Sequence, residues 1–232
     1  MKGFLFLWFI IYILVPNSPA DAQNTTGKKD AVLDNSRIVS YLNTIRESDI
    51  EKLKQFYEEH GSVNHSTEYE PGSEPRHPAI EAALADNIVI MRWLIDRDVD
   101  LNVSSHGIGS SVSTTPVTIA LTKGNSEMLV LLLEAGADIT RGQPLARAVG
   151  RGNHNQILVL LDHGADPNDE KALGIAAALD DTVSIGLLLD AGADPNIGAP
   201  LVTAVFWASR DAESMLRAAG ADPEKPGLVS PR

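Results

Sequence analysis

The sequence predicts an all-α solenoid of stacked helix pairs, because three kinds of residue recur with one fixed step. Glycine recurs every 28 residues, at Gly136, Gly164, Gly192 and Gly220. Alanine recurs with the same step at Ala120, Ala148, Ala176 and Ala204, and leucine at Leu132, Leu160, Leu188 and Leu216. A unit of this length holds two short helices that cannot bury their own apolar faces, so neighbouring units must stack against one another.

The repeat at residues 115–140 shows how the sequence defines each helix pair. Pro116 marks the start of a first helix, where its missing N–H is not needed, and Gly124 marks the end of that helix. A second helix follows, because apolar residues recur at helical spacing, at Met128, Leu129, Leu132 and Leu133. Gly136 then stands where a left-handed residue closes a helix.

The repeat step is longer in the N-terminal half of the chain. A step of 38 residues leads back from Pro116 to Pro78, from Ala120 to Ala82 and from Leu132 to Leu94. The extra length predicts two long loops, or fingers, at residues 64–77 and 102–115, whereas the later loops are shortened. A further step of 38 residues leads from Leu94 to Phe56 and marks a degenerate first helix pair.

These repeats resemble the ankyrin repeat family, whose signature is T-P-L-H-x-A, with a second helix that ends near G-A-D-x-N. Segments 115–120, 143–148 and 199–204 match the first part, and 164–168 and 192–196 match the second. The resemblance implies an ankyrin-like helix-pair solenoid of about six repeats over residues 34–224, with two long N-terminal fingers and shortened C-terminal ones. None of the repeats has the histidine of the family motif. The residues at its position are Ile80, Thr118, Ala146, Gly174 and Val202. This weakens the expectation that the inter-repeat loops are firmly tied to the helices.

The last repeat is predicted to cap the stack. Glu213 and Arg217 stand where earlier repeats carry leucine or isoleucine, one turn apart on one helix face and in the order that favours an ion pair. A soluble face is needed there, because no further repeat covers it. Trp93, by contrast, aligns with apolar positions of the later repeats and is predicted to belong to the core.

Both ends of the chain are predicted to lie outside the solenoid. Residues 1–22 are typical of a secretory signal peptide, because Lys2 precedes an uncharged apolar stretch and a small-x-small triplet ends at Ala22. Cleavage there implies a periplasmic protein without a membrane anchor, or an exported eukaryotic protein. An uncleaved N-terminal anchor is the alternative. Residues 23–33 are predicted to form a linker and residues 225–232 a C-terminal tail.

Composition limits the function classes. The formal net charge of −12 and the sequence pI of about 4.8 disfavour nucleic-acid binding, which needs clustered Lys and Arg, and favour a basic protein partner. The chain has no cysteine, which excludes disulfides, thiolate nucleophiles and cysteine-bound zinc. No cofactor is predicted, because the serine- and glycine-rich stretch 104–116 lacks the lysine of a phosphate-binding loop.

The sequence favours a non-catalytic protein. Aspartates of the G-A-D column recur with the turn and are predicted to be structural, at Asp138, Asp166, Asp194 and Asp222. His65, His77 and His106 lie in the two fingers, where they could either form a metal site or be solvated loop residues. The fingers lack a close metal-ligand spacing, which favours the second interpretation.

Binding residues are expected on the surface made by the fingers and the first helices, because stacking leaves their outward side chains free to vary. In the ankyrin family the pair of residues at the end of each first helix faces this surface. The aromatic pair Phe206 and Trp207 is either a binding hot spot or a cover over the open end of the last repeat. The first finger is either an acidic contact site or a solvated loop. The candidate partner-binding residues are His65, Glu68, Tyr69, Glu70, Glu74, Arg76, His106, Lys123, Arg151, Phe206 and Trp207.

The expected function is that of a periplasmic module that recognises one partner protein. Similar exported bacterial ankyrin proteins include immunity proteins that block a toxin, such as a secreted lipase, and accessory proteins that support oxidant defence. The acidic charge and the long fingers favour the inhibitor. A metal-dependent enzyme that uses the finger histidines and a membrane-tethered scaffold are the rival interpretations. The oligomeric state does not follow from the residues.

Overall fold

The computed structural model describes residues 33–67, 76–106 and 113–224. The predicted signal peptide, almost all of the predicted linker and the predicted tail lie outside these residues, so their boundaries stay predictions. Within the described residues, no helix is long and apolar enough to cross a membrane.

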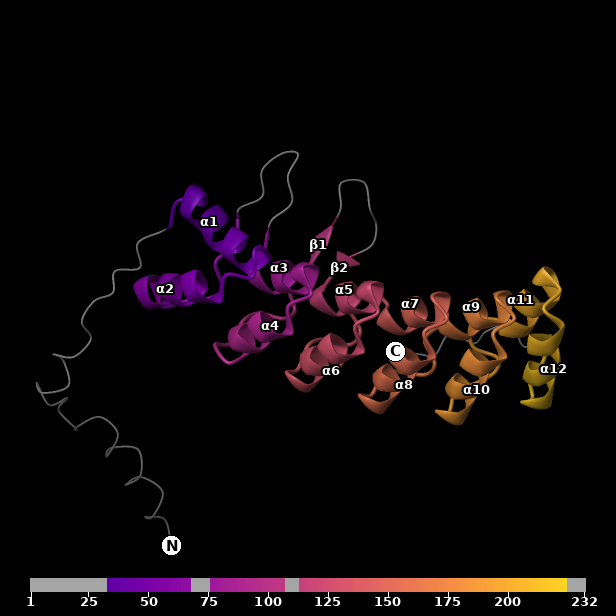
Figure 1. Ribbon diagram of the computed structural model, residues 1–232. Helices are drawn as coiled ribbons and strands as arrows, with labels where there is room; N and C mark the ends of the chain where they lie inside the picture. Colours follow the sequence, from indigo (N-terminus) through magenta and orange to yellow (C-terminus); the bar gives the residue numbers. More distant parts are fainter. Residues whose placement is uncertain (1–32, 68–75, 107–112, 225–232) are drawn as a thin grey trace, which may run out of the picture. The chain divides into compact units, whose positions relative to one another are not determined.

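The described residues form helix pairs that stack in sequence order (Figure 1). The first helices of the pairs are α1 (Asn35–Arg46), α3 (Pro78–Ala85), α5 (Pro116–Lys123), α7 (Pro144–Gly150), α9 (Ala172–Ala178) and α11 (Pro200–Trp207). The second helices are α2 (Ile50–His60), α4 (Ile88–Ile95), α6 (Ser126–Glu134), α8 (His154–Asp162), α10 (Thr182–Asp190) and α12 (Arg210–Ala218).

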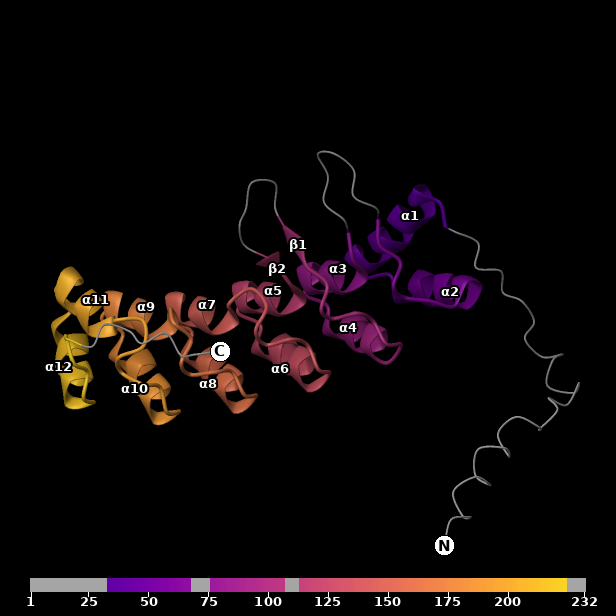
Figure 2. The ribbon, with the colours of Figure 1, turned by 180° about the vertical axis from the view of Figure 1, so that it is seen from behind.

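The helices lie in two layers, and both views of the ribbon show them (Figures 1 and 2). Each first helix packs against the first helix of the next pair, from α1 through α11, which makes the first-helix layer. The second helices from α4 to α12 pack in the same way and make the second-helix layer. The predicted all-α solenoid of stacked pairs is thus confirmed. The second finger adds a short antiparallel hairpin, β1 (Ser105–His106) and β2 (Ser113–Thr114).

Helix ends follow the capping residues of the sequence. Asn125 and Asn153 each accept a hydrogen bond from the backbone N–H three residues later and so begin α6 and α8. Proline occupies the first turn of α3, α5, α7 and α11, as predicted. Gly124 closes α5 with a φ of 73°, in the left-handed region. The glycine column after the second helices is left-handed as well, with a φ of 86° at Gly136 and Gly164.

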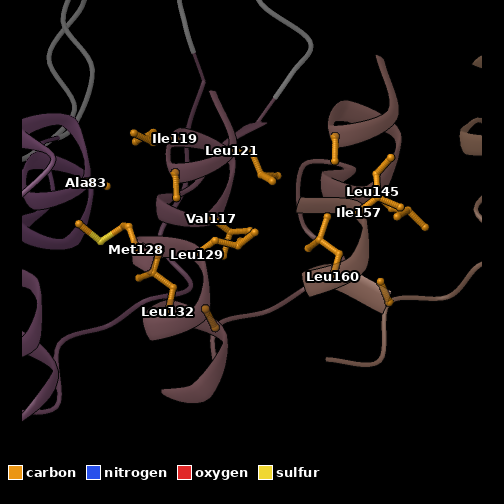
Figure 3. Packing of buried hydrophobic residues seen from close by; sticks show 14 of the residues in the cluster. Ala83, Val117, Ile119, Leu121, Met128, Leu129, Leu132, Leu145, Ile157 and Leu160 are labelled. Atoms are coloured by element: carbon orange, nitrogen blue, oxygen red, sulfur yellow. The ribbon is translucent and has the colours of Figure 1, made fainter. Parts of the chain in front are cut away.

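The core runs between the two layers (Figure 3). In the alanine column, Ala82, Ala120, Ala148, Ala176 and Ala204 are all buried, and in the leucine column Leu94, Leu132, Leu160, Leu188 and Leu216 are fully buried. Figure 3 shows Met128, Leu129 and Leu132 of α6 beside Val117 of α5, with Ile157 and Leu160 of α8 beyond them. Each fully buried leucine stabilises the stack by about 1.5–3 kcal/mol relative to an exposed one. Trp93 is partly buried and packs against this core, as predicted.

In two of the shortened loops between repeats, two consecutive residues adopt the left-handed backbone conformation. These are Gly142 and Gln143 before α7, and Gly198 and Ala199 before α11. A Cβ at Gly198 would collide with the backbone carbonyl of Glu170, so the loop packs directly on the loop of the preceding repeat. The third short loop, before α9, reaches the same length without a left-handed residue at Lys171.

Asparagine side chains tie one repeat to the next where the family's motif histidine is absent. The Oδ1 atoms of Asn64 and Asn102 accept the backbone N–H of Asp100 and Asp138 at 2.8 and 2.7 Å. Asn168 and Asn196 repeat the bond to Asp194 and Asp222 at 2.8 and 2.9 Å. The sequence interpretation did not include these hydrogen bonds, although two of the four asparagines, Asn168 and Asn196, end the G-A-D-P-N segments.

The G-A-D aspartates act within their own turns. Their side chains accept the backbone N–H of the residue two positions later, in Asp138, Asp166, Asp194 and Asp222. This geometry agrees with their predicted structural role. In the last helix Arg217 Nε donates to Glu213 Oε1 at 2.9 Å, so the predicted ion pair of the capping repeat is present.

Candidate protein-interaction surface

The C-terminal end of the first-helix layer exposes a group of apolar side chains. Their exposed fractions are 56% for Leu179, 49% for Val202, 52% for Val205, 78% for Phe206 and 63% for Trp207. We call these five residues the apolar end patch. The rings of Phe206 and Trp207 meet edge to face, with centroids 5.4 Å apart. Exposed side chains of this size on a soluble protein are typical of binding surfaces.

The patch is exposed because the layer ends there. Val202, Val205 and Phe206 follow the i, i+3, i+4 spacing of one helix face. The residues that match Val205 in earlier repeats are buried, at Ala83, Leu121, Val149 and Ala177. No described helix follows α12 and covers this face.

The last helices of the two layers end the stack with different kinds of side chain. The second helix α12 presents the Glu213–Arg217 ion pair, whereas the first helix α11 has no charged residue. Phe206 and Trp207 lie against each other and are largely exposed, so they do not bury themselves over the open end. Of the two interpretations of this pair, the structure favours an accessible surface.

Two cations extend this surface toward the middle of the stack. Lys123 ends α5 and Arg151 caps α7, in the positions that Leu179 and Trp207 occupy in the next two repeats. Both are exposed, and neither forms an ion pair with a carboxylate of the described residues. Arg151 also lines an open depression over the turn between α7 and α8. These two predicted binding residues and the aromatic pair therefore share the ends of the first helices.

Arg76, a predicted partner contact, is engaged inside the protein. Its Nε donates to Glu81 Oε1 at 2.6 Å, and its Nη1 donates to Asn43 of α1 at 3.1 Å. Arg46 donates to the same Glu81 carboxylate through Nε and Nη2. Glu81 is 2% exposed, so its buried charge depends on the two guanidinium groups. Arg76 therefore stabilises the fold by pairing with Glu81. The sequence interpretation missed this partner, because Glu81 lies in an otherwise apolar helix.

The base of the first finger is closed by hydrogen bonds. Arg76 N–H donates to Thr67 Oγ1 at 2.7 Å, and Thr67 N–H donates to the carbonyl of Arg76 at 3.1 Å. The predicted contact residues between them, Glu68, Tyr69, Glu70 and Glu74, lie outside the described residues.

His65 lies in an aromatic cluster and not on an open loop. Its ring meets Tyr41 and Phe56 edge-on, with centroids 5.9 and 5.7 Å away, and His60 is a further neighbour at 6.4 Å. Burial, together with the charge of His60, lowers the pKa of His65. Burial also raises the pKa of the Tyr41 hydroxyl, which donates to the carbonyl of Val63.

The other two finger histidines, His77 and His106, belong to different elements of the structure. His77 directly precedes α3, and burial lowers its pKa. His106 belongs to β1, and its side chain lies outside what the structure describes. Among the described residues, no group of three or more His, Asp and Glu side chains could hold a metal ion.

The sequence interpretation placed Leu179 in the outward-facing pair at the end of its first helix, but it missed two members of the apolar end patch, Val202 and Val205. One signal was present in the sequence: these valines occupy positions that are buried between repeats, in the last of the predicted repeats.

The sequence interpretation also missed a contact between α8 and the start of α10. His154 Nε2 lies 3.0 Å from the carboxylate of Asp181. Burial raises the pKa of Asp181, but hydrogen bonds from Ser184 and His154 outweigh it and lower the pKa overall.

Comparison with known proteins supports the fold. No family profile matches the chain, and no curated protein matches its sequence. An ankyrin repeat domain from Acinetobacter baumannii has a TM-score of 0.64 at 25% identity, over 79% of this chain and 98% of that domain. The human ASB11 ankyrin repeat domain has a TM-score of 0.61 at 20% identity, over 82% of this chain and 88% of that domain. Together with the repeated columns and the layered helix pairs, these similarities show that the chain has the ankyrin repeat fold.

Proposed function

We propose that this chain is a non-catalytic protein-binding module that recognises one partner through the ends of its first helices. The observation that carries the proposal is the apolar end patch. At the C-terminal end of the stack, the second-helix layer presents the polar residues Glu213 and Arg217. The first-helix layer does not, because α11 exposes two valines and two aromatic rings there. Clustered aromatic residues at the centre of an interface supply most of its binding free energy.

The place of action in this proposal is the periplasm. The N-terminal sequence supports it through its signal-peptide pattern, and cleavage after Ala22 would release a mature chain that begins at Gln23. N-terminal sequencing of the protein from its own cells tests this step. A chain that still begins at Met1 and fractionates with membranes would exclude it.

The net charge of −12 supports a partner that is basic as a whole, because opposite net charges speed encounter. A secreted toxin held inactive by an immunity protein is one such partner, and a protein that this module assists is the other. The effect on the partner's activity in the reconstituted complex distinguishes inhibition from assistance.

The test of binding is site-specific cross-linking in periplasmic extract. A photoreactive amino acid in place of Val205 should cross-link one dominant protein, and the double change Phe206→Ala and Trp207→Ala should abolish the product. The control is Val89→Ala with Val183→Ala, because these two valines are also exposed, by 71% and 52%, but lie on the second helices α4 and α10.

The control pair should leave the cross-linked product unchanged. Equal loss of product in both double variants, with unchanged circular dichroism, would show that the surface is not selective. No product at all from Val205 or from Lys123 would contradict the proposed function.

A further inference from the structure

Charge is segregated between the two helix layers in the C-terminal part of the stack. The first helices α5, α7, α9 and α11 contain no aspartate or glutamate, and their charged residues are Lys123 and Arg147. The second helices carry the carboxylates, at Glu127, Glu134, Asp162, Asp190, Asp211 and Glu213. A net charge of −12 therefore describes the chain as a whole and not the surface of the first-helix layer.

The ends of the first helices also follow a spatial order. Matching positions in successive repeats hold Lys123, Arg151, Leu179 and Trp207, with Phe206 beside the last. The surface is therefore cationic over α5 and α7 and apolar over α9 and α11. Lys123 and Arg151 have no described carboxylate partner, so their charges are available to a ligand.

Two carboxylates border this surface. Asp180 follows Leu179, and its Oδ1 accepts the backbone N–H of Ala212 at 2.8 Å. Asp86 accepts a hydrogen bond from Asn125 Nδ2 at 2.8 Å, beside the end of α5. The cationic character therefore belongs to the side chains of Lys123 and Arg151 themselves, and both carboxylates already accept hydrogen bonds within the protein.

From this arrangement we infer that the segment seated on the first-helix layer is an acidic–apolar peptide segment of a partner protein. Its carboxylates face Lys123 and Arg151, and its apolar side chains cover Leu179, Phe206 and Trp207. The inference rests on the proposed function and names the partner chemistry of that site. It differs from the basic partner that net charge favours, because the segment meets this layer and not the acidic second helices.

The dimensions of the layer set the length of the segment. Adjacent packed helices lie about 8–10 Å apart, so Lys123 and Trp207, three helices apart, are separated by roughly 24–30 Å. An extended chain covers this distance in about eight or nine residues. The carboxylates and the apolar side chains must occupy opposite halves of such a segment.

Fluorescein-labelled peptides of twelve residues test the inference directly. One peptide has an Asp/Glu block followed by a Leu/Phe block, a second has Lys in place of the acidic residues, and a third has the first composition in scrambled order. Binding to the chain from Gln23 is measured by fluorescence anisotropy at low and moderate salt. The acidic block peptide should bind at least about tenfold tighter than either of the others, and more weakly as salt rises.

Variants of the protein locate the two halves of the site. Lys123→Glu with Arg151→Glu should weaken the acidic block peptide by about tenfold, and Phe206→Ala with Trp207→Ala by about thirtyfold. Lys52→Glu with Lys54→Glu on α2 is the matched charge control, and Val89→Ala with Val183→Ala is the matched apolar control. Neither control pair should change the affinity by more than about twofold.

Three outcomes would overturn the inference and leave the proposed function standing, because cross-linking to a native partner is a separate measurement. They are preference for the Lys peptide, indifference to the charge reversal, and no binding of any peptide. One other occupant would overturn it as well. A dimer that is lost in the Phe206→Ala, Trp207→Ala variant would identify a second copy of the chain on this layer.

Discussion

The N-terminal and C-terminal halves of this stack hold similar helix pairs together in different ways. In the N-terminal half, side chains hold the base of the first finger, with Glu81 bonded to Arg46 and Arg76 and with the ring cluster around His65. In the C-terminal half, two of the short loops contain consecutive left-handed residues, as at Gly198 and Ala199, and asparagine side chains join neighbouring repeats. Buried charge and ring contacts therefore support the N-terminal connection, whereas backbone conformation contributes more to the short ones.

The surfaces of the two halves differ as well. The first-helix layer ends at α11, and Leu179, Phe206 and Trp207 at this end are largely exposed. The N-terminal half buries the charged side chain of Glu81, whereas the C-terminal half ends in a group of exposed apolar side chains. For this reason the proposed partner-binding site is placed in the C-terminal half.

The largest effect is expected at the junction of the halves. Leu132 of α6 is fully buried, so Leu132→Ala should lower the free energy of unfolding by about 2–5 kcal/mol. Urea unfolding of the chain from Gln23 should show the loss by both circular dichroism and tryptophan emission. The control Leu158→Ala, at a half-exposed site on α8, should cost far less. Equal costs would mean that the two layers are not packed as described.

A second change tests the backbone of the C-terminal half. Gly198→Ala places a Cβ against the Glu170 carbonyl at a φ of 74°, and should cost about 2–3 kcal/mol of unfolding free energy. Gly136→Ala is the matched control, because its φ is 86° and no atom lies within 4 Å of the added Cβ. It should cost about 1–2 kcal/mol, the strain of the left-handed conformation alone. An equal cost at both positions would argue against close packing of the two loops.

A third change tests the side-chain network of the N-terminal half. Glu81→Gln keeps the shape but removes the charge that two arginines share, and should cost about 1–2 kcal/mol. Emission from Trp93, read in a Trp207→Phe background, reports this half in urea unfolding. Glu51→Gln is the control, since Glu51 pairs with Lys54 at the exposed surface and should cost less than about 0.5 kcal/mol.

The smallest effect is a pH dependence specific to the N-terminal half. Burial lowers the pKa values of His65 and His77 below 6.5, so both rings stay neutral in the folded chain when the unfolded chain already binds protons. Their contribution to stability is complete above pH 6.5 and is lost as pH falls from there through the lowered pKa values. His65→Phe should make the dependence less steep between pH 6.5 and 5, measured by Trp93 emission.

The carboxylates affect stability in a lower pH range than these histidines. Hydrogen bonds from Thr140 lower the pKa of Asp138, so its contribution is present above its ordinary value of 3.8 and is lost as pH falls below it. An unchanged slope between pH 6.5 and 5 in His65→Phe would mean that this histidine is not desolvated in the folded chain.

Much of the fold follows from the sequence because repeats constrain one another. The columns of Ala120 and Leu132, the proline starts and the left-handed Gly136 were all predictable, since each residue type fits one local environment. The polar end of α12 was predictable for the same reason. The network of Glu81 was not, because nothing in the spacing of Arg46, Arg76 and Glu81 indicates that they meet.

The binding surface divides in the same way. From the residues alone, one can predict the repeat, the helix pairs, the acidic net charge and the aromatic pair at Phe206 and Trp207. Packing between the repeats places Val202 and Val205 beside that pair, and it leaves Lys123 and Arg151 without an ion pair to a carboxylate of the described residues. The physical reason is that exposure and charge segregation depend on which faces the stack covers, and these faces are fixed by packing between repeats and not within one.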